Sequence, residues 1–152
     1  MSGDIQYLLD YVAIRQLNAL YNRLADGGDG DAYSKLYTED AEFNIVGNQT
    51  YYGRTEIASA AAATKVTVHV TTEPEIKIDG DVATQRVRML SVYRAEDLSR
   101  NDFVASGWYV DELKRTEDGW RYHRRRAELD LDIAEVFRKM TITESFAALA
   151  KD

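Results

Sequence analysis

The sequence has no cysteine, one proline and two histidines among its 152 residues. Without cysteine there are no disulfide bonds, thiolate metal sites or cysteine nucleophiles. Two histidines leave few ligands for zinc, so we expect no metal site. The chain also lacks a GxSxG motif, a phosphate-binding loop and a dinucleotide-binding fingerprint, which argues against an α/β-hydrolase and against a nucleotide cofactor. We therefore expect any activity to need no cofactor.

Long apolar runs are also missing. No stretch approaches the roughly 20 apolar residues of a membrane span, and the N-terminus has no basic region followed by an apolar run. The net charge of −7 disfavours nucleic acid and anionic membranes, because both attract basic surfaces. Hydrophobic residues make up 45% of the chain, with ten tyrosines, as in a folded globular protein. We expect one cytoplasmic domain over residues 1–152, with a small hydrophobic organic molecule as its partner.

An apolar stripe at helical spacing predicts a long first helix. It consists of Ile5, Leu8, Leu9, Val12, Ala13, Leu17, Leu20 and Leu24. Gly27 and Gly28 can end this helix, which puts Asp26 in or just past its last turn. The helix dipole does not favour a carboxylate there, so Asp26 needs another partner or is simply solvated beside the glycine turn.

Shorter elements follow the first helix. Residues 29–31 can cap a second helix that ends by Thr38. The alternation over residues 41–46 predicts a half-buried strand that runs into a turn at GNQT. Thr55 can cap a thin, alanine-rich third helix.

The rest of the chain is rich in β-branched residues and predicts two long hairpins. Residues 65–78 pair with 82–95 through an Asp-Gly turn near Asp79 and Gly80, with a bend at Pro74. Residues 103–115 pair with 120–132, and a polar link precedes them. Helices followed by antiparallel strands indicate an α+β fold with the helices on one face of a curved sheet. The tail, residues 129–152, is a final helix, a lid or an oligomer contact.

His69 is a candidate for acid–base chemistry. Strand alternation puts it on the same face as Thr67 and Thr71, opposite the valines of TVHVTT. If the valine face packs under the helices, His69 points to solvent. If the sheet curls into a cup, His69 points into the cavity.

The cationic run HRRRAE, residues 123–128, is divided between two strand faces, with Arg124 and Arg126 on one and His123 and Arg125 on the other. We expect at least two of these arginines to be solvated, because charged side chains are seldom buried. An arginine that faces inward would need an acid or an anionic substrate as its partner.

Five segments carry a family resemblance: AIRQLNALYNRLAD, DAYSKLYTEDAEF, YYGRTEI, HVTTEPEIKIDGDVAT and DGWRYHRRR. In this order and spacing they resemble the SnoaL-like branch of the nuclear transport factor 2 superfamily, from about Tyr7 to Glu128. The resemblance implies a cone in which a strongly bent antiparallel sheet and about three helices enclose one deep apolar pocket. It also implies a homodimer or homotrimer.

Within that branch the sequence is similar to scytalone dehydratase, hexachlorocyclohexane dehydrochlorinase and bile-acid 7α-dehydratase, which use a histidine–aspartate pair without a cofactor. The matching positions are His69 and Asp26. Tyr21 matches a pocket tyrosine of the bile-acid enzyme, and Arg125 matches a pocket arginine of the dehydrochlorinase. Two positions depart from these enzymes. Tyr21 stands where the dehydrochlorinase has a lysine on its first helix, and the position of the bile-acid enzyme's second carboxylate corresponds to about Val92, so that enzyme's full site is not reproduced.

These matches imply a lyase of the dehydratase type or a double-bond isomerase. His69 would remove a proton next to a carbonyl, Asp26 would orient His69, and Tyr21 would donate a hydrogen bond to the enolate or leaving oxygen. Arg125 would either hold Asp26 ionised or bind a substrate carboxylate. Candidate residues for the pocket lining are Tyr51, Tyr52, Trp108 and Tyr109. The alternatives are a small-molecule binding protein without catalysis and a subunit that acts only by assembly.

Overall fold

The structure is a computed structural model that describes residues 2–64, 67–94, 101–132 and 135. The expected tail helix, apart from its first few residues, and most of the polar link before residue 103 lie outside the described residues. The elements are α1 (Ser2–Gly27), α2 (Gly30–Ser34), β1 (Tyr37–Ile45), β2 (Gln49–Tyr52), α3 (Gly53–Thr64), β3 (Thr67–Thr71), β4 (Glu75–Asp79), β5 (Val82–Arg94), β6 (Asn101–Thr116) and β7 (Gly119–Leu129).

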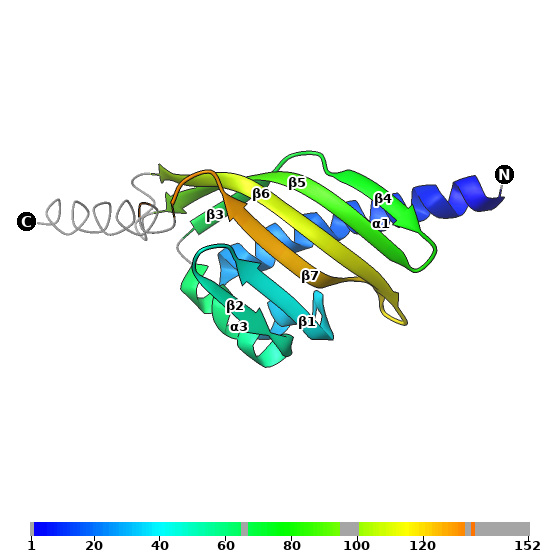
Figure 1. Ribbon diagram of the computed structural model, residues 1–152, viewed down its shortest axis with the longest axis horizontal. Helices are drawn as coiled ribbons and strands as arrows, with labels where there is room; N and C mark the ends of the chain where they lie inside the picture. The colour runs from blue at the N-terminus through cyan, green and yellow to red at the C-terminus, as the bar shows by residue number, and fades with distance from the viewer. Residues whose placement is uncertain (1, 65–66, 95–100, 133–134, 136–152) are drawn as a thin grey trace, which may run out of the picture.

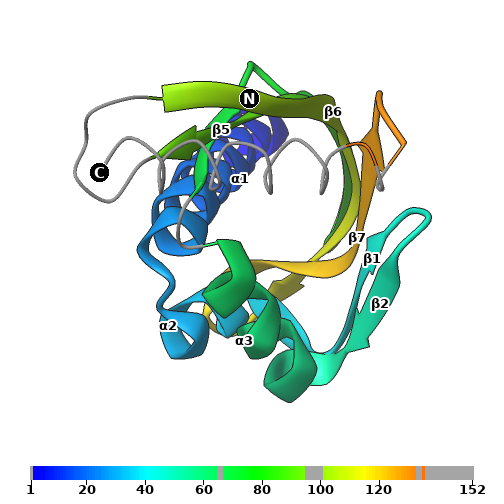
Figure 2. The same cartoon turned by 90° about the vertical axis from the view of Figure 1, so that its left-hand side faces the viewer.

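The strands form one seven-stranded sheet in the order β2-β1-β7-β6-β5-β3, with β4 beside β5. The sheet bends around the helices without closing, and all three helices lie on its concave side (Figure 2). Both predicted hairpins are confirmed, β4–β5 and β6–β7. The predicted sheet was antiparallel throughout, but β1 runs parallel to β7. A parallel neighbour needs a long crossover connection, and here the chain from β2 to β6 supplies it.

Helix α1 is buried along only part of its predicted stripe. Its second half packs Ile14, Leu17, Tyr21 and Ala25 into the core. In the first half the large apolar side chains of the stripe are between 50% and 61% exposed: Ile5, Leu8, Leu9 and Val12. A helix of 26 residues is about 39 Å long, and α1 runs past the end of the sheet (Figure 1). The periodicity therefore predicted the helix correctly, but only the second half of the stripe is buried.

Of the two short helices, α2 fits its prediction and α3 begins earlier than predicted. Helix α2 is capped by Asp29, whose Oδ1 accepts from the Ala32 amide at 3.0 Å, and it ends at Ser34, before Thr38. Thr38 belongs to β1. Helix α3 begins at Gly53, two residues before the predicted cap at Thr55, and the Tyr52 amide donates to a side-chain oxygen of Glu56 at 2.8 Å. No helix among the described residues is long and apolar enough to cross a membrane.

Candidate functional site

His69 faces the concave side of the sheet. It pairs with Ser91 in the ladder between β3 and β5, and its neighbour Val70 points outward with 49% of its surface exposed. The side chain of His69 is only 8% exposed. Of the two expected orientations, the structure has the one in which the sheet curls and turns the polar face of β3 inward.

Asp26 lies in the last turn of α1, where it meets β3. Its Oδ1 accepts a hydrogen bond from the backbone amide of His69 at 2.9 Å and lies 2.8 Å from Nδ1 of the same residue. Gly28, with a φ of 68°, lets the chain turn away just beyond it. One carboxylate oxygen thus fixes both the backbone and the ring of His69. The alternative of a solvated acid beside the glycine turn is wrong, because the Asp26 side chain is only 20% exposed.

This contact determines which ring nitrogen of His69 can act on a ligand. An ionised carboxylate only accepts hydrogen bonds, so Nδ1 carries the proton that it shares with Asp26. Nε2 then holds the lone pair and is the nitrogen that can take up a proton. The geometry is that of an imidazole base whose tautomer is set by an acid.

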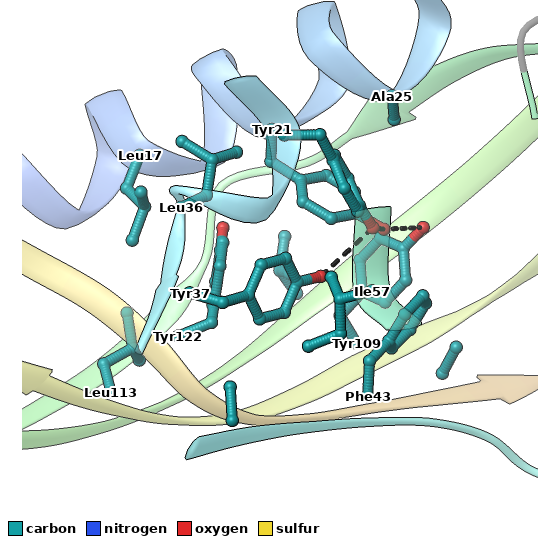
Figure 3. Packing of buried hydrophobic residues seen from close by; sticks show 14 of the residues in the cluster. Leu17, Tyr21, Ala25, Leu36, Tyr37, Phe43, Ile57, Tyr109, Leu113 and Tyr122 are labelled. Carbon is teal, nitrogen blue, oxygen red and sulfur yellow. Dashed lines mark hydrogen bonds between the residues drawn. The ribbon is translucent and has the colours of Figure 1, made fainter. Parts of the chain in front are cut away.

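Tyr21, five residues before Asp26, lies beside His69 in the core. The two rings meet edge to face with centroids 6.4 Å apart. The Tyr21 hydroxyl accepts from Tyr33 at 3.2 Å and donates to Tyr109 at 3.4 Å, while Tyr33 lies 3.1 Å from the hydroxyl of Tyr37. Figure 3 shows Tyr21, Tyr37 and Tyr109 gathered in the core.

Arg125 is the inward-facing arginine of the cationic run, with 1% of its surface exposed. Its Nε and Nη2 each bond a different oxygen of Asp111 at 2.8 Å. Its guanidinium carbon lies 3.9 to 4.1 Å from the ring centroids of Tyr21, Tyr109 and Tyr122. Burial is the largest single effect and lowers the pKa of Arg125, but the Asp111 carboxylate, together with Tyr122 and Tyr21, holds that pKa well above its usual value.

The partner of Arg125 corrects one expectation. The acid that it pairs with is Asp111, not Asp26. Arg124 and Arg126, its neighbours on the other strand face, are exposed, as expected of at least two arginines in the run.

Sequence reasoning missed a buried amide network next to this ion pair. The Gln85 amide nitrogen donates to Asp111 at 2.6 Å and to Asn18 at 2.8 Å, and the Asn18 oxygen also accepts from the Tyr122 hydroxyl at 2.7 Å. Two signals were present in the sequence. Asn18 falls next to Leu17 in the apolar stripe, and Asp111 alternates with Tyr109 on the core face of β6.

The expected lining residues do not lie together. Tyr109 is in the core, and Tyr51 is half-buried and stacks on Phe43 with centroids 6.0 Å apart. Tyr52 is 62% exposed, so its expected place in a pocket is wrong. Trp108 faces the outer side of the sheet, under the guanidinium of Arg86 at 3.9 Å, because it alternates with Tyr109.

Metal ligands are sparse in the described part of the chain. There, no three side chains of His, Asp or Glu cluster closely enough to hold a metal ion. The other histidine, His123, lies on β7 with Nδ1 3.1 Å from the Thr38 hydroxyl and 3.5 Å from an oxygen of Asp40.

Comparisons with known proteins agree with this fold. An NTF2-like protein with a cystatin-like fold from Novosphingobium aromaticivorans is 30% identical, with a TM-score of 0.78 over 88% of this chain and 91% of that chain. Rv3472 from Mycobacterium tuberculosis, a protein of unknown function, is 28% identical, with a TM-score of 0.75 over 87% of this chain and 78% of that chain. ActVI-ORFA from Streptomyces coelicolor is 20% identical, with a TM-score of 0.70 over 79% and 96%, and this likeness shows the fold alone.

No curated protein matches the sequence. The SnoaL-like domain family matches residues 6–126, and the resemblance inferred from the sequence is thereby confirmed. The observed architecture is the α+β cone of NTF2-like proteins, with a curved sheet that stays open. The chain therefore belongs to the SnoaL-like family, whose fold is shared by dehydratases, isomerases and polyketide cyclases.

Proposed function

We propose that this protein is a cofactor-independent lyase or double-bond isomerase that removes a proton next to the carbonyl of a small hydrophobic cyclic substrate. The observation that carries the proposal is the contact of Asp26 with both the ring and the backbone of His69, at 2.8 and 2.9 Å. A histidine held in one tautomer by a partly buried acid is suited to act as a general base.

The reaction begins when Nε2 of His69 takes the proton. The electrons of the broken C–H bond move into the bond toward the carbonyl carbon, and the carbonyl oxygen becomes an enolate. Asp26 stabilises the imidazolium that forms. In elimination, the enolate then expels a β-hydroxyl group, which leaves as water with the proton from His69. In isomerisation, the same proton returns to a different carbon.

The enolate oxygen carries the charge that develops in the transition state. Tyr21, whose ring lies beside that of His69, would supply a neutral donor when its hydroxyl turns from Tyr109 to the substrate oxygen. Donors held in place inside a buried site stabilise a developing oxyanion more than water does, because they need no reorganisation.

The test is a screen of alicyclic and aromatic β-hydroxy ketones for the ultraviolet absorbance gained on dehydration. His69→Ala should lower kcat by about 10²- to 10⁴-fold, the range attributed to general bases. Asp26→Asn should also lower kcat while the protein stays folded, and the double variant should be scarcely worse than His69→Ala, because the two residues work as one unit.

The matched control is His123→Ala. His123 is also partly buried beside an acid, with 14% of its side chain exposed, but it lies on β7 beside Thr38 and Asp40 of β1. The His123→Ala variant should turn over substrate at the normal rate. If His69→Ala also turned over normally, or if the wild type bound these ketones without converting them, a small-molecule binding protein would replace this proposal.

A further inference from the structure

The first half of α1 carries a row of exposed apolar side chains, which we call the N-terminal row: Ile5, Leu8, Leu9 and Val12. Each is between 50% and 61% exposed, and this half of the helix extends past the end of the sheet (Figure 1). Together the four side chains expose on the order of 400 Å² of apolar surface, a size at which a patch on a single chain is often a binding surface.

The row lies on the opposite side of α1 from the core. Asp10 and Ile14 are 5% and 0% exposed, and each is two residues away from Val12 in the sequence. Two residues correspond to roughly 200° around an α-helix, so the row points away from the strands whose side chains cover Asp10. A shift of α1 against its own sheet would therefore not bury the row.

The charges near the row argue against a lipid surface as its partner. Residues 1–14 contain no lysine or arginine, but they contain two acids, Asp4 and Asp10. A helix that lies on a membrane surface is rich in lysine and arginine on its polar face. The net charge of the chain is −7, which anionic lipids repel. The chemistry that fits the row is the apolar surface of another protein.

The spacing of the row fits a second copy of itself. Its members are separated by three, one and three residues, so the spacing is the same from either end. Residues three and four apart share one face of a helix. When two α1 helices run antiparallel, with a two-fold axis between Leu8 and Leu9, Leu8 faces the partner's Leu9 and Ile5 faces the partner's Val12. Every side chain of the row then meets one from the other copy.

The charges at the two ends of the row favour the antiparallel direction. Asp4 precedes the row and Arg15 follows it, eleven residues or about three helical turns later, so both lie on the same flank of α1. Arg15 pairs with Glu73 at 2.8 Å and still has 49% of its side chain exposed. Antiparallel helices bring Asp4 of one copy toward Arg15 of the other and oppose their helix dipoles, whereas parallel helices bring like charges together.

The area of the row is sufficient for a reversible dimer. Two facing rows bury on the order of 800 Å², and the side chains that flank them bring the total to about 1,000 Å², the lower bound for a specific interface. We propose that two copies of this chain associate through antiparallel pairing of their N-terminal rows, with an affinity in the micromolar range. The inference goes beyond the proposed function, whose residues lie in the second half of α1 and in β3.

Sedimentation velocity of the full chain, from low to high micromolar concentration, tests the surface. The wild type should pass from monomer to dimer over this range. Leu8→Glu should raise the dissociation constant at least about tenfold, because the two-fold axis brings the new carboxylate into the apolar contact twice. The matched control is Val70→Glu, since Val70 is 49% exposed on the outer face of β3. This control should dimerise like the wild type, and both variants should keep the wild-type circular dichroism spectrum.

The direction of the helices can be tested because the chain has no cysteine, so every disulfide comes from an introduced residue. Ile5→Cys and Val12→Cys proteins, mixed in equal amounts and oxidised, should crosslink to each other faster than either crosslinks to itself. In the antiparallel pair, position 5 lies opposite position 12, while the two copies of position 5 are about 10 Å apart along the helices, too far for a disulfide.

Four results would overturn the proposal. The first is a wild type that stays monomeric at every concentration. The second is an oligomer that Val70→Glu disrupts and Leu8→Glu does not, which would assign the contact to the outer face of the sheet. The third is faster crosslinking between like variants than between Ile5→Cys and Val12→Cys. The fourth is a monomer that binds phosphatidylcholine vesicles and loses this binding in Leu8→Glu, which would assign the row to a lipid surface.

Discussion

Replacing Asp111 by Asn would leave the guanidinium of Arg125 buried without its counter-charge. The two side chains are 0% and 1% exposed, and Asp111 accepts from Arg125 at 2.8 Å through each oxygen and from Gln85 at 2.6 Å. Asn has the same shape but no charge, and its amide NH₂ group would face other donors. Removing one partner of a buried ion pair costs about 3–5 kcal/mol.

Urea unfolding followed by circular dichroism would measure this loss. With a denaturant slope of about 2 kcal/mol per molar, the unfolding midpoint of Asp111→Asn should fall by about 1.5–2.5 M. The next residue provides a control, because Glu112 pairs with Arg124 at 3.5 Å on the exposed side of the same strands. Glu112→Gln should change the free energy of unfolding by less than about 0.5 kcal/mol.

A double-mutant cycle completes the test. Arg125→Met removes the cation and keeps much of its volume, so Asp111→Asn combined with Arg125→Met should be less destabilised than the sum of the two single changes. Two results would show that the buried pair is not the source of stability that its geometry indicates. One is that the losses in unfolding free energy of the two single variants are additive, and the other is that Asp111→Asn is no more destabilised than Glu112→Gln.

Two further predictions concern the stability of the fold. Hydrogen bonds from Arg115, at 2.5 and 2.7 Å, hold the pKa of Asp10 well below its usual value, against the effect of burial. The stability that these bonds provide is present above about pH 4 and is lost as the pH falls toward the lowered pKa of Asp10. Asp10→Asn should therefore reduce the free energy of unfolding by on the order of 2 kcal/mol at pH 7, and by progressively less below pH 4. Urea unfolding at each pH measures this difference. A Cβ on Gly107 would meet the backbone oxygen of Glu128 at 2.3 Å. Gly107→Ala should therefore push β6 away from β7 and lower the free energy of unfolding by about 1–3 kcal/mol. An unchanged melting temperature would contradict this prediction.

Periodicity in the sequence was sufficient for most of the fold. Helix α1 and both hairpins follow from spacing alone, and the Asp-Gly turn lies between β4 and β5 as predicted. The contact between Asp26 and His69 was anticipated because a carboxylate at a helix C-terminus lacks a favourable partner and because the family resemblance matched both positions. The catalytic roles of these residues stay predictions.

Pairing across strands was not predictable from the sequence. Alternation turns Asp111 and Arg125 inward, but they meet because they are directly opposite in the ladder between β6 and β7. That register depends on an irregularity between Glu112 and Leu113, which no local pattern reveals. The exposed first half of α1 was missed for a related reason. An apolar stripe shows which face is hydrophobic, but not how far the rest of the molecule extends along it.

The parallel ladder between β1 and β7 has a consequence for synthesis on the ribosome. Strand β1 is among the first to emerge, yet its neighbour β7 is the last strand of the sheet. Until β7 leaves the exit tunnel, β1 can pair only with β2, and the edge of β6 that will receive β7 is open. Unpaired edges invite association with other chains. A nascent chain that stalls before residue 119 should therefore need protection by a chaperone. Once β7 has emerged, it pairs with β1 on one side and with β6 on the other and so covers both open edges.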